Sequence, residues 1–573
     1  MTELRTIKHY FSRYFLRLFL GVLAVISVDV CQLWIPRLIK KAIDELAGTN
    51  PDRAVLLNCA LIIFGLAVLI ALLRFIWRWL ILGFSRLLEM KLRNKLFSHI
   101  LTLDRTFFHQ KSTGDLMALA TNDLQAVQMA CGMGIVAAID ASVMGLAALA
   151  CMFYIHPTLA FTALLPMPFL IVGARVLTGR LHRLFTTVQE EFAQLTEFTR
   201  NTLATIPLVK AYNQEQHHSR QFARLGRSYV RHNFRLSFIN GALFPLSGLV
   251  ANTSMLLILL VGGKLVINQQ ISIGDFVAFI AYLYMLTWPM MALGWVVNLF
   301  QRGRSSLKRI NNVLRAAPLL ALPVNGRIPQ EVTKIKLKDL SFTYPAGNRP
   351  VLQNLDLTIT PGIWGITGRT GCGKTTLCHL LAYLYPLEEN MIYWNGQDIN
   401  ELAPAAVRKQ ISYAEQDGIL FSDTIRANIA LGKPEAGDRE IKSVAELADI
   451  HNEIMAMPQG YDTLIGEKGV LLSGGQRQRI LLARSLLPGR PLLLIDDALS
   501  AVDTETEQRI IANLSSYPLC RICVIVSHRV ISLGLADKII VIDDGGIVAV
   551  GSHAELKENN EFYATICRQQ EES

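Results

Sequence analysis

A glycine-rich segment at residues 368–375 is the part of the sequence whose residue types most directly imply chemistry. It reads Gly-Arg-Thr-Gly-Cys-Gly-Lys-Thr and satisfies the pattern G-x-x-x-x-G-K-[ST] in full. An expected strand at 363–367 precedes it and an expected helix start at 376–381 follows it, which is the context that a phosphate-binding loop requires. The glycines let backbone N–H groups close around phosphates, Lys374 neutralises their charge, and Thr375 can bind Mg²⁺. The segment therefore predicts a nucleotide site.

Two acidic residues follow a short apolar strand further along the chain. Residues 492–495 read Leu-Leu-Leu-Ile and end in Asp496 and Asp497. A carboxylate at the carboxyl end of a buried strand beside a phosphate loop suits a Mg²⁺ ligand, so we expect Asp496 to take this role. The alternative, a charged strand end at an ordinary turn, is disfavoured by the loop upstream.

A second glycine-rich segment, Leu-Ser-Gly-Gly-Gln, occupies residues 472–476 and precedes an expected helix at 477–487. A nucleotide already wrapped by the first loop leaves no room for a second phosphate nest of the same domain. The second segment makes sense when two such domains hold ATP between them head to tail. At this point the chain resembles the ATP-binding cassette transporters, and the resemblance covers essentially its whole length.

The resemblance implies roles for further residues, which occur in the order of the family's motifs. It implies that Tyr344 stacks on adenine, that Gln416 links Mg²⁺ to the membrane domain, and that His528 contacts the γ-phosphate. Ser500 and Asp503 resemble the ends of a loop that crosses between two cassettes.

The expected site divides into four groups. The residues expected to bind ATP are Tyr344, Gly368, Arg369, Thr370, Gly371, Cys372, Gly373, Lys374, Thr375 and Thr376. Those expected to serve the partner's ATP are Leu472, Ser473, Gly474, Gly475 and Gln476. The expected Mg²⁺ ligands are Thr375, Gln416 and Asp496, and the expected catalytic residues are Asp497, His528 and Gln416.

Position 497 departs from the family's pattern. The family places glutamate directly after the Mg²⁺ aspartate, where it orients and polarises the attacking water, whereas this chain has Asp497. One methylene fewer draws the carboxylate back by about 1.5 Å, and a misplacement of about 1 Å can cost on the order of a hundredfold in rate. Aspartate and glutamate have similar pKa values, so the expected defect is one of geometry.

The intact segment at 472–476 argues against a homodimer with two impaired sites. In a heterodimer it faces the phosphate loop of a partner that keeps glutamate, and so completes one competent site. Residues 497–503 resemble the same segment of bacterial heterodimeric multidrug-resistance-like half-transporters. We therefore expect an obligate heterodimer with one degenerate and one competent site for ATP hydrolysis.

The composition indicates which elements must carry this site. Of the 573 residues 51% are hydrophobic and 18% charged, whereas soluble proteins carry about 25% charge. Apolar stretches long enough to cross a bilayer as helices all lie before residue 300. The six expected spans lie near residues 14–35, 54–80, 132–155, 158–175, 239–261 and 276–297. This composition excludes a disordered chain and a soluble ATPase.

The expected organisation follows from this division. Residues 1–315 are expected to form an all-α membrane domain of six helices with two long cytoplasmic extensions, and 316–335 a linker. Residues 336–573 are expected to form an α/β P-loop nucleotide-binding domain. The net charge of +10 comes largely from Lys and Arg beside the spans, which predicts cytoplasmic termini and an inner-membrane location rather than nucleic-acid binding. The exception is a basic cluster at 37–41 in an expected outer loop.

The two cytoplasmic extensions are expected to be helical and interrupted once each. Turn-forming residues near 111–115 predict the first interruption and Pro207 the second. By resemblance, residues 113–116 with 121–123, and residues 209–212, form the regions that rest on the cassettes.

The cargo is the least defined part of the prediction. Residues 282–291 of the last span are rich in Met and aromatic side chains, which suit varied apolar ligands but equally suit lipid or helix packing. Ionisable residues at membrane depth are costly to bury. Four such residues lie in the expected spans, namely Asp29, Arg74, Arg78 and Asp140. One hypothesis is that Arg78 and Asp140 form an ion pair, either structural or in contact with the substrate. The expected function is ATP-driven export of hydrophobic or amphipathic compounds across the bilayer. A lipid or lipopeptide flippase and an exporter-fold importer of a metal chelate remain alternatives.

Overall fold

The chain divides into two compact units. The computed structural model describes residues 5–48, 51–318, 320, 329–345, 347, 349–416, 418–466, 472–515 and 520–571. The membrane unit comprises residues 1–100 and 114–315, and the cassette unit comprises residues 101–113 and 316–573. A short piece of the N-terminal half therefore belongs to the C-terminal unit. Asp417, much of the expected linker and residues 467–471 lie outside the described residues.

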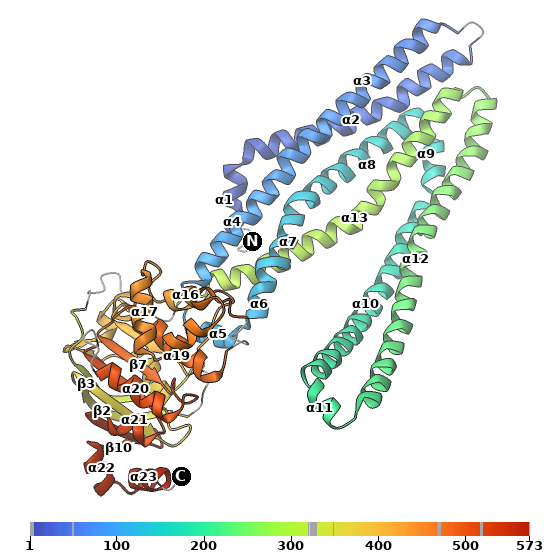
Figure 1. The fold of residues 1–573 in the computed structure, drawn as a ribbon. Coiled ribbons are helices and arrows are strands. Elements are labelled where there is room, and N and C mark those ends of the chain that lie inside the picture. The colour runs from blue at the N-terminus through green and yellow to red at the C-terminus, as the bar shows by residue number, and fades with distance from the viewer. Residues whose placement is uncertain are drawn as a thin grey trace. The chain divides into compact units, whose positions relative to one another are not determined.

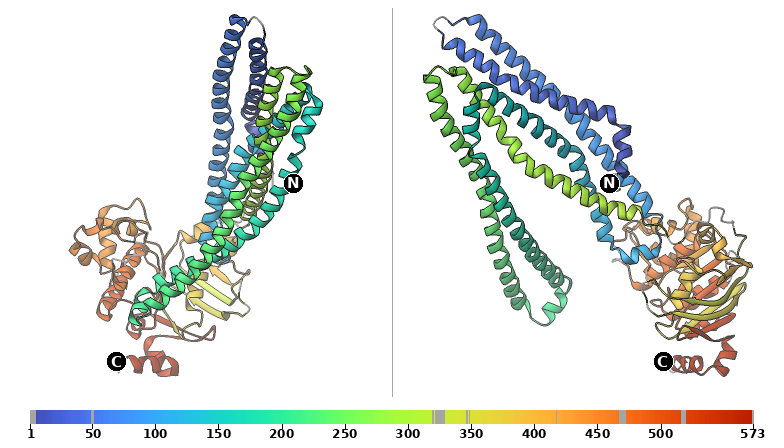
Figure 2. Two further views of the ribbon diagram at one scale, coloured as in Figure 1. Left: turned by 90° about the vertical axis from the view of Figure 1, so that its right-hand side faces the viewer. Right: turned by 180° about the vertical axis from the view of Figure 1, so that it is seen from behind.

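The described part of the membrane unit consists of helices (Figure 1). Their bounds are α1 (Arg5–Arg13), α2 (Phe15–Leu46), α3 (Arg53–Trp77), α4 (Gly83–Ile100), α6 (Thr113–Ala118), α7 (Leu124–Met129), α8 (Ile135–Ile155), α9 (Pro157–Leu164), α10 (Met167–Ala204), α11 (Ile206–Ala211), α12 (Glu215–Ile267) and α13 (Ile273–Leu314). Three π-helical turns join neighbouring helices, namely η2 (Arg78–Leu82), η3 (Leu119–Asp123) and η4 (Ala130–Gly134). Helices α10 and α12 run side by side as a long hairpin closed by α11 (Figures 1 and 2).

Five of the described helical segments are long and apolar enough to cross a membrane. They are Phe15–Leu46, Arg53–Ile100, Thr113–Ile155, Gly248–Ile267 and Ile273–Leu314. These segments match five of the six expected spans. The remaining expected span, 158–175, begins on a shorter apolar helix, Pro157–Phe169. As expected, α12 continues far beyond its apolar part, because it runs for 53 residues without a break.

Two helix boundaries fall at proline, one between the expected spans 132–155 and 158–175 and one at the predicted break of Pro207. Helix α8 ends at Ile155, and the His156 side chain accepts a hydrogen bond from the backbone of Leu159 at 3.4 Å. Pro157 then opens α9, where its missing N–H costs nothing. The same rule places Pro207 in the first turn of α11, after α10 has ended.

The first extension is interrupted twice. Helix α4 ends at Ile100, a separate helix α5 covers Arg105–Gln110, and α6 begins at Thr113. The break at 111–112 lies at the predicted position, although Gly114 itself lies within α6. The earlier break, at 101–104, was not predicted. The Asp104 carboxylate accepts hydrogen bonds from the backbone of Thr106 at 3.1 Å and Phe107 at 3.4 Å, and this N-cap starts α5.

The described residues of the cassette unit form two sheets. The strands are β1 (Ile335–Phe342), β2 (Leu352–Ile359), β3 (Gly362–Gly368), β4 (Ile392–Trp394), β5 (Gln397–Asp398), β6 (Ile411–Ala414), β7 (Leu492–Asp496), β8 (Ile522–Val526), β9 (Lys538–Asp543) and β10 (Gly546–Gly551). An antiparallel sheet has the order β2-β1-β4-β5, and the larger sheet has the order β10-β9-β3-β8-β7-β6. In the larger sheet only β10 is antiparallel to its neighbour.

The helices of the cassette unit follow the expected α/β pattern. They are α14 (Lys374–Leu381), α15 (Pro404–Arg408), α16 (Ile425–Ala430), α17 (Asp438–Leu447), α18 (His451–Ala456), α19 (Gly474–Leu486), α20 (Thr504–Ser515), α21 (Val530–Gly534), α22 (His553–Asn559) and α23 (Glu561–Glu571). Short 3-10 turns lie at Ile399–Glu401 and Gly460–Asp462.

Strand β7 shows why these runs of apolar residues form buried strands. Leu492 and Leu494 belong to one hydrophobic core, and Leu493 and Ile495 belong to another. The alternation of a strand thus places successive side chains on opposite, covered faces of the sheet. Strands β3, β7 and β8 are parallel neighbours, so their carboxyl ends meet at one edge. That edge positions the candidate site.

Candidate nucleotide site

The glycine-rich loop connects β3 to α14. Gly368 and Gly373 have φ values of +152° and +101°, which L side chains rarely adopt. A Cβ on Gly368 would lie 2.0 Å from the carbonyl oxygen of Ile542, and one on Gly373 would lie 3.0 Å from that of Val351. The loop therefore requires glycine for both conformation and space. It delivers backbone N–H groups to the N-terminus of α14, a favourable place for phosphate.

Lys374 lies inside this loop. Its Nζ donates hydrogen bonds to the carbonyl oxygens of Gly368 at 3.0 Å and Arg369 at 2.8 Å. The ammonium group is buried, and the loop holds it where a phosphate chain would pass. The next residue, Thr375, donates from its hydroxyl to Oδ1 of Asp496 at 3.1 Å. The loop and the end of β7 are thus brought into contact.

Asp496 is the most buried acid of the site, with 1% of its surface exposed. Burial raises its pKa, while hydrogen bonds from Thr375 and from the Tyr413 hydroxyl, 3.2 Å from Oδ2, act in the opposite direction. A carboxylate that burial disfavours gains stability from a nearby cation. The oxygen donors of Asp496 and Thr375 therefore fit Mg²⁺. The expected third ligand, Gln416, instead donates from Nε2 to Oδ2 of Asp497 at 3.2 Å.

Asp497, His528 and Lys374 lie close enough together for their charges to interact. The pKa of Asp497 is raised, chiefly by burial, and the nearby His528 and Lys374 oppose this. The pKa of His528 is lowered by burial and then by Lys374, with Asp497 acting against both. The structure therefore places the expected catalytic residues in one electrostatic group at the ends of β7 and β8.

The backbone of Asp497 is fixed. Its φ is +48°, in the left-handed region, and its N–H donates to the carbonyl of Val526 at 3.1 Å. The adjacent strand thus holds the backbone while Gln416 holds the side chain.

The second glycine-rich segment forms the start of α19. The Ser473 hydroxyl accepts from the backbone N–H of Gln476 at 3.2 Å, and Oε1 of Gln476 accepts from the backbone of Ser473 at 3.0 Å. This capping box orders the helix N-terminus. Gly475 lies against the backbone of Ala501, because an added Cβ would be 3.0 Å from that carbonyl oxygen. None of the hydrogen bonds described for Ser473 and Gln476 reaches the phosphate loop.

The loop at 500–503 is held from several sides. The Ser500 hydroxyl donates to the carbonyl of Asp497 at 2.9 Å and accepts from Gln478 at 3.1 Å. Asp503 accepts from the backbone N–H of Thr506 at 2.9 Å and so caps α20. This hydrogen bond lowers the pKa of Asp503. The loop is therefore connected to both Asp497 and α19.

Tyr344 lies beside the start of α14. Its hydroxyl is 2.9 Å from the hydroxyl of Thr376, and its ring packs edge-on against Phe342 and Tyr385 at 5.1 and 5.2 Å. The ring is half-buried, which suits a platform for a planar base. Its proposed contact with adenine stays a prediction.

The sequence analysis missed Arg529, which follows His528. The guanidinium donates to the carbonyl oxygens of Val502 at 2.6 Å and Ser500 at 2.8 Å, and to the carboxylate of Glu507 at 2.7 Å. Glu507 is only 1% exposed. Arg529 therefore joins the segment that carries His528 to the 500–503 loop. No spacing in the sequence indicates this connection, because its partners belong to another loop and helix.

The segment that lies on the cassette is α5, which the sequence analysis also missed. Arg105 is 3.1 Å from Nε2 of His379 and 3.7 Å from Glu415, the neighbour of Gln416. His109 is 3.0 Å from the Tyr385 hydroxyl. His379 is buried in α14, and burial, followed by Arg105, lowers its pKa to about 4. A chain segment from between two membrane spans thus contacts both α14 and the residue before Gln416.

Asp123 accepts from Ser306 at 2.8 Å and from Nε of Arg309 at 2.9 Å. These bonds tie η3 to α13 within the membrane unit. The expectation that residues 113–116 with 121–123 rest on a cassette stays a prediction. The second expected region coincides with α11, where Leu208 and Tyr212 are exposed. A coupling role for α11 stays a prediction.

The hypothesis of an Arg78–Asp140 pair is also wrong for the described residues. Asp140 accepts from the indole Nε1 of Trp288 at 2.8 Å. The Arg78 guanidinium lies over the ring of Trp77, 5.6 Å from its centroid. The aromatic neighbour of Arg78 thus takes the place of the expected carboxylate.

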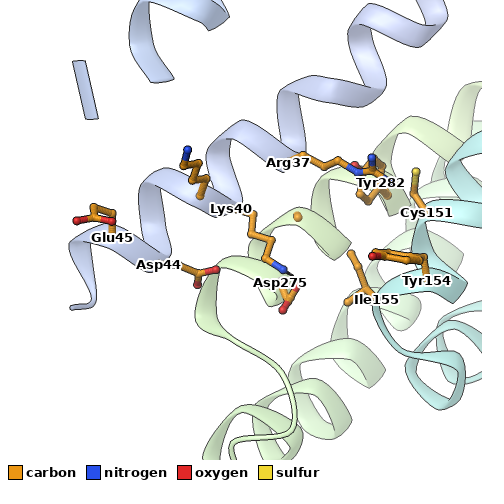
Figure 3. Close-up of a pocket in the computed structure, with 11 residues that line it drawn as sticks. Arg37, Lys40, Asp44, Glu45, Cys151, Tyr154, Ile155, Asp275 and Tyr282 are labelled. Atoms are coloured by element: carbon orange, nitrogen blue, oxygen red, sulfur yellow. Dashed lines mark ion pairs between the residues drawn. The ribbon is translucent and has the colours of Figure 1, made fainter. Parts of the chain in front are cut away.

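The basic cluster at 37–41 lines a cavity of about 560 Å³ between α2, α8 and α13 (Figure 3). Lys40 forms an ion pair with Asp275 at 2.5 Å, and Arg37 points toward Tyr282 with its guanidinium 5.8 Å from the Tyr154 ring. Arg37 and Lys40 belong to the basic cluster that was the exception to the expected cytoplasmic excess of Lys and Arg. Both side chains are engaged in local contacts.

A helical membrane unit followed by a phosphate-loop cassette with a second glycine-rich helix start defines an ATP-driven transporter. The ABC transporter transmembrane region matches residues 18–290, and the ABC transporter domain matches residues 352–500. The chain therefore belongs to the ABC transporter family. Its single transmembrane region and single cassette give it the architecture of a half-transporter.

Curated relatives match nearly the whole chain. It is 34% identical over 563 residues to the probable multidrug resistance ABC transporter ATP-binding/permease protein YheI of Bacillus subtilis, covering 98% of this chain and 96% of that protein. It is 32% identical over 475 residues to the ATP-dependent lipid A-core flippase of Syntrophus aciditrophicus, covering 82% and 79%. A solved bacterial Atm1-family ABC exporter with ATP bound superimposes with a TM-score of 0.80 at 24% identity, covering 97% and 99%. The fold is thus that of an exporter.

Proposed function

We propose that this chain is one half of a heterodimeric exporter that moves hydrophobic or amphipathic compounds across the cytoplasmic membrane, with both termini in the cytoplasm. The observation that carries the proposal is Asp497, which stands where the family has glutamate, in a site that otherwise retains its ATP-binding residues. The partner half would supply the glutamate. Relatives named for multidrug resistance support the cargo class.

The surroundings of Asp497 support a slow site. Its backbone is held by Val526 and its carboxylate by Gln416. The side chain therefore cannot move forward by the length of a methylene without losing a hydrogen bond. A general base about 1 Å out of place loses on the order of a hundredfold in rate.

The remaining residues support ATP binding at this site. The loop N–H groups and Lys374 would hold the phosphates, and Asp496 with Thr375 would hold Mg²⁺. When bound, Mg²⁺ neutralises charge on the β- and γ-phosphates. His528 lies near Lys374 and Asp497, where it can donate to a phosphate oxygen.

The helix start at 473–476 supports a second subunit. Its N–H groups form an anion site at the end of a helix that the capping box keeps ordered. In the proposed heterodimer this helix would complete the partner's competent site. Residues 500–503, tied to both Asp497 and α19, would lie between the two sites.

The test compares the purified chain alone with the chain co-expressed with the half-transporter encoded beside it. We expect ATPase activity of the pair to exceed that of the lone chain by at least about tenfold. The Lys374→Ala variant, purified without a partner, measures the contaminating ATPase activity. Robust ATPase from the lone chain, equal to that of the pair, would contradict the heterodimer.

A second comparison tests the asymmetry within the pair. We expect Asp497→Ala to change turnover far less than removal of the partner's glutamate, because only the latter acts at the competent site. Comparable losses from the two substitutions would refute a degenerate site.

A lipid flippase is the second candidate, favoured by the relative named as an ATP-dependent lipid A-core flippase. ATPase activity in nanodiscs of defined lipid separates the two functions. Stimulation by an added lipid, with no response to hydrophobic drugs, would favour the flippase.

A further inference from the structure

Two cysteines of the cassette unit lie close together in the sequence, at the start of β8. Cys523 is the second residue of the strand and is buried, whereas Cys520 lies just before the strand and is half-buried. Neither thiol belongs to the nucleotide site described above. No group of three or more His, Cys, Asp or Glu side chains in the described part of the chain is placed to hold a metal ion. A C-x-x-C segment without a metal site is a candidate for thiol–disulfide chemistry.

An irregularity at the start of β8 brings the two thiols to the same face of the sheet. The backbone N–H groups of Arg521 and Ile522 both donate to the carbonyl oxygen of Pro491, each at 2.9 Å. Because they share one acceptor, these two residues occupy a single position of the ladder, as in a β-bulge. Cys520 and Cys523 are therefore two positions apart instead of three, and their side chains point to the same side.

The packing around the two cysteines supports this arrangement. Cys523 belongs to the hydrophobic core that contains Leu493 and Ile495, and Cys520 packs against the same core. The Cys520 thiol donates to the carbonyl oxygen of Ile522 at 3.3 Å, which belongs to the peptide bond leading into Cys523. Two positions of a strand span about 6.6 Å, and a disulfide accepts Cα atoms up to about 6.8 Å apart. The pair can therefore be joined without rebuilding the strand.

The two thiols differ in reactivity. A hydrogen bond with Cys523 lowers the pKa of Cys520, and burial acts in the opposite direction. The same hydrogen bond raises the pKa of Cys523, as does its burial. The more exposed Cys520 therefore forms the thiolate more readily, while Cys523 is a shielded thiol beside it.

We propose that Cys520 and Cys523 are a reversible dithiol–disulfide pair that reacts with low-molecular-weight organic disulfides such as glutathione disulfide. The Cys520 thiolate attacks one sulfur of the organic disulfide, forms a mixed disulfide and releases one thiolate. Cys523 then gives its proton to water and attacks Sγ of Cys520, which releases the second thiolate. The two cysteines lose two electrons, and the organic disulfide gains them and becomes two thiols.

The position of the pair separates this reaction from the nucleotide chemistry. Strand β8 runs from the two cysteines to Val526, whose carbonyl oxygen accepts from the backbone N–H of Asp497. The pair and the nucleotide site therefore lie at opposite ends of one strand. A change at the pair can be measured without ATP and without a partner chain, so it can fail independently of the proposed heterodimer.

The test treats the full, folded chain in detergent with glutathione disulfide, blocks the remaining thiols with N-ethylmaleimide, and then denatures and digests the protein with trypsin. Trypsin cleaves after Arg521, so Cys520 and Cys523 fall in separate peptides, residues 510–521 and 522–529. We expect mass spectrometry to find these peptides joined by a disulfide, and to find them separate after reduction with dithiothreitol. Absence of the joined peptides, or glutathione that remains on Cys520, would overturn the proposal.

Two variants test the order of the steps. In Cys523→Ser the second attack is impossible, so we expect glutathione to remain on Cys520 at a level at least about tenfold above that in the unmodified chain. The matched control is Cys567→Ser, which removes another buried cysteine of the same unit and should leave the yield of joined peptides unchanged. Equal retention of glutathione in Cys523→Ser and the unmodified chain would contradict the role of Cys523. The measurement on the unmodified chain does not depend on whether either variant folds.

Discussion

The buried acids of the two units differ in how they are compensated. In the cassette unit, Asp496 has two hydroxyl partners, and Glu507 has the guanidinium of Arg529. In the membrane unit, Asp123 is likewise bonded to Arg309, but Asp29 has no hydrogen-bond partner among the described residues. A buried acid with its own cation is part of the framework. A buried acid without one adds less to the stability of the fold.

The largest expected effect comes from breaking the compensated pair in the cassette. Arg529→Ala leaves Glu507 buried and uncompensated, which we expect to lower the free energy of unfolding by about 3 kcal/mol or more. Thermal unfolding of the full chain in detergent measures the change. Arg521→Ala is the matched control, because its ion pair with Glu331 is exposed on both sides and such pairs contribute about 1 kcal/mol or less. Equal shifts would show that burial of Glu507 is unimportant.

The next prediction concerns pH and the contact of α5. The pKa of His379 is about 4 in the folded chain and 6.5 when exposed, so below pH 6.5 the unfolded chain binds a proton that the folded chain does not. Stability is therefore lost as pH falls from about 6.5 toward 4, by about 2 kcal/mol at pH 5. The difference in unfolding temperature between the unmodified chain and His379→Gln, measured from pH 7.5 to 5, isolates this contribution. A difference that stays constant with pH would contradict it.

The Asp497→Glu substitution tests whether residue 497 limits ATP hydrolysis at this site. Glutamate restores the missing methylene beside Gln416 and His528, so we expect the ATPase of the lone chain to rise by about tenfold or more. Asp52→Glu adds the same methylene at the N-cap of α3, in the membrane unit and outside the nucleotide site, and serves as control. A lone chain that remains slow with glutamate would place the defect elsewhere than at residue 497.

The elements of the cassette unit that depend on short stretches of sequence were predictable. The strand at 492–496 and the loop at 368–375 lie where the sequence predicts, because alternation and glycine spacing are local. Helix α19 is also found, but it begins at Gly474, before the expected start at 477, because the capping box of Ser473 and Gln476 extends it. The position of α5 was not predictable, since six residues with a single cap carry little helical signal. Its contact joins Arg105 to a histidine 274 residues away.

In the membrane unit, hydropathy predicted most spans but not the partners of their charged residues. Any of several helices can supply a partner at a given depth, so Arg78 and Asp140 were paired on depth alone. The packing gives Asp140 an indole on α13 and gives Arg78 the ring of Trp77. Only tertiary structure distinguishes Asp123, whose cation is 186 residues away, from Asp29.

The smallest expected effect is that of Asp29→Ala, and a comparison with Asp123→Ala makes it informative. Asp123→Ala leaves the Arg309 guanidinium without its carboxylate, and we expect about 2 kcal/mol or more of destabilisation. Asp29→Ala removes an uncompensated group, so we expect no loss and at most about 1 kcal/mol of gain. Unfolding temperatures of both variants in the same detergent measure the contrast. A large destabilisation by Asp29→Ala would instead place it with Asp123 in the framework.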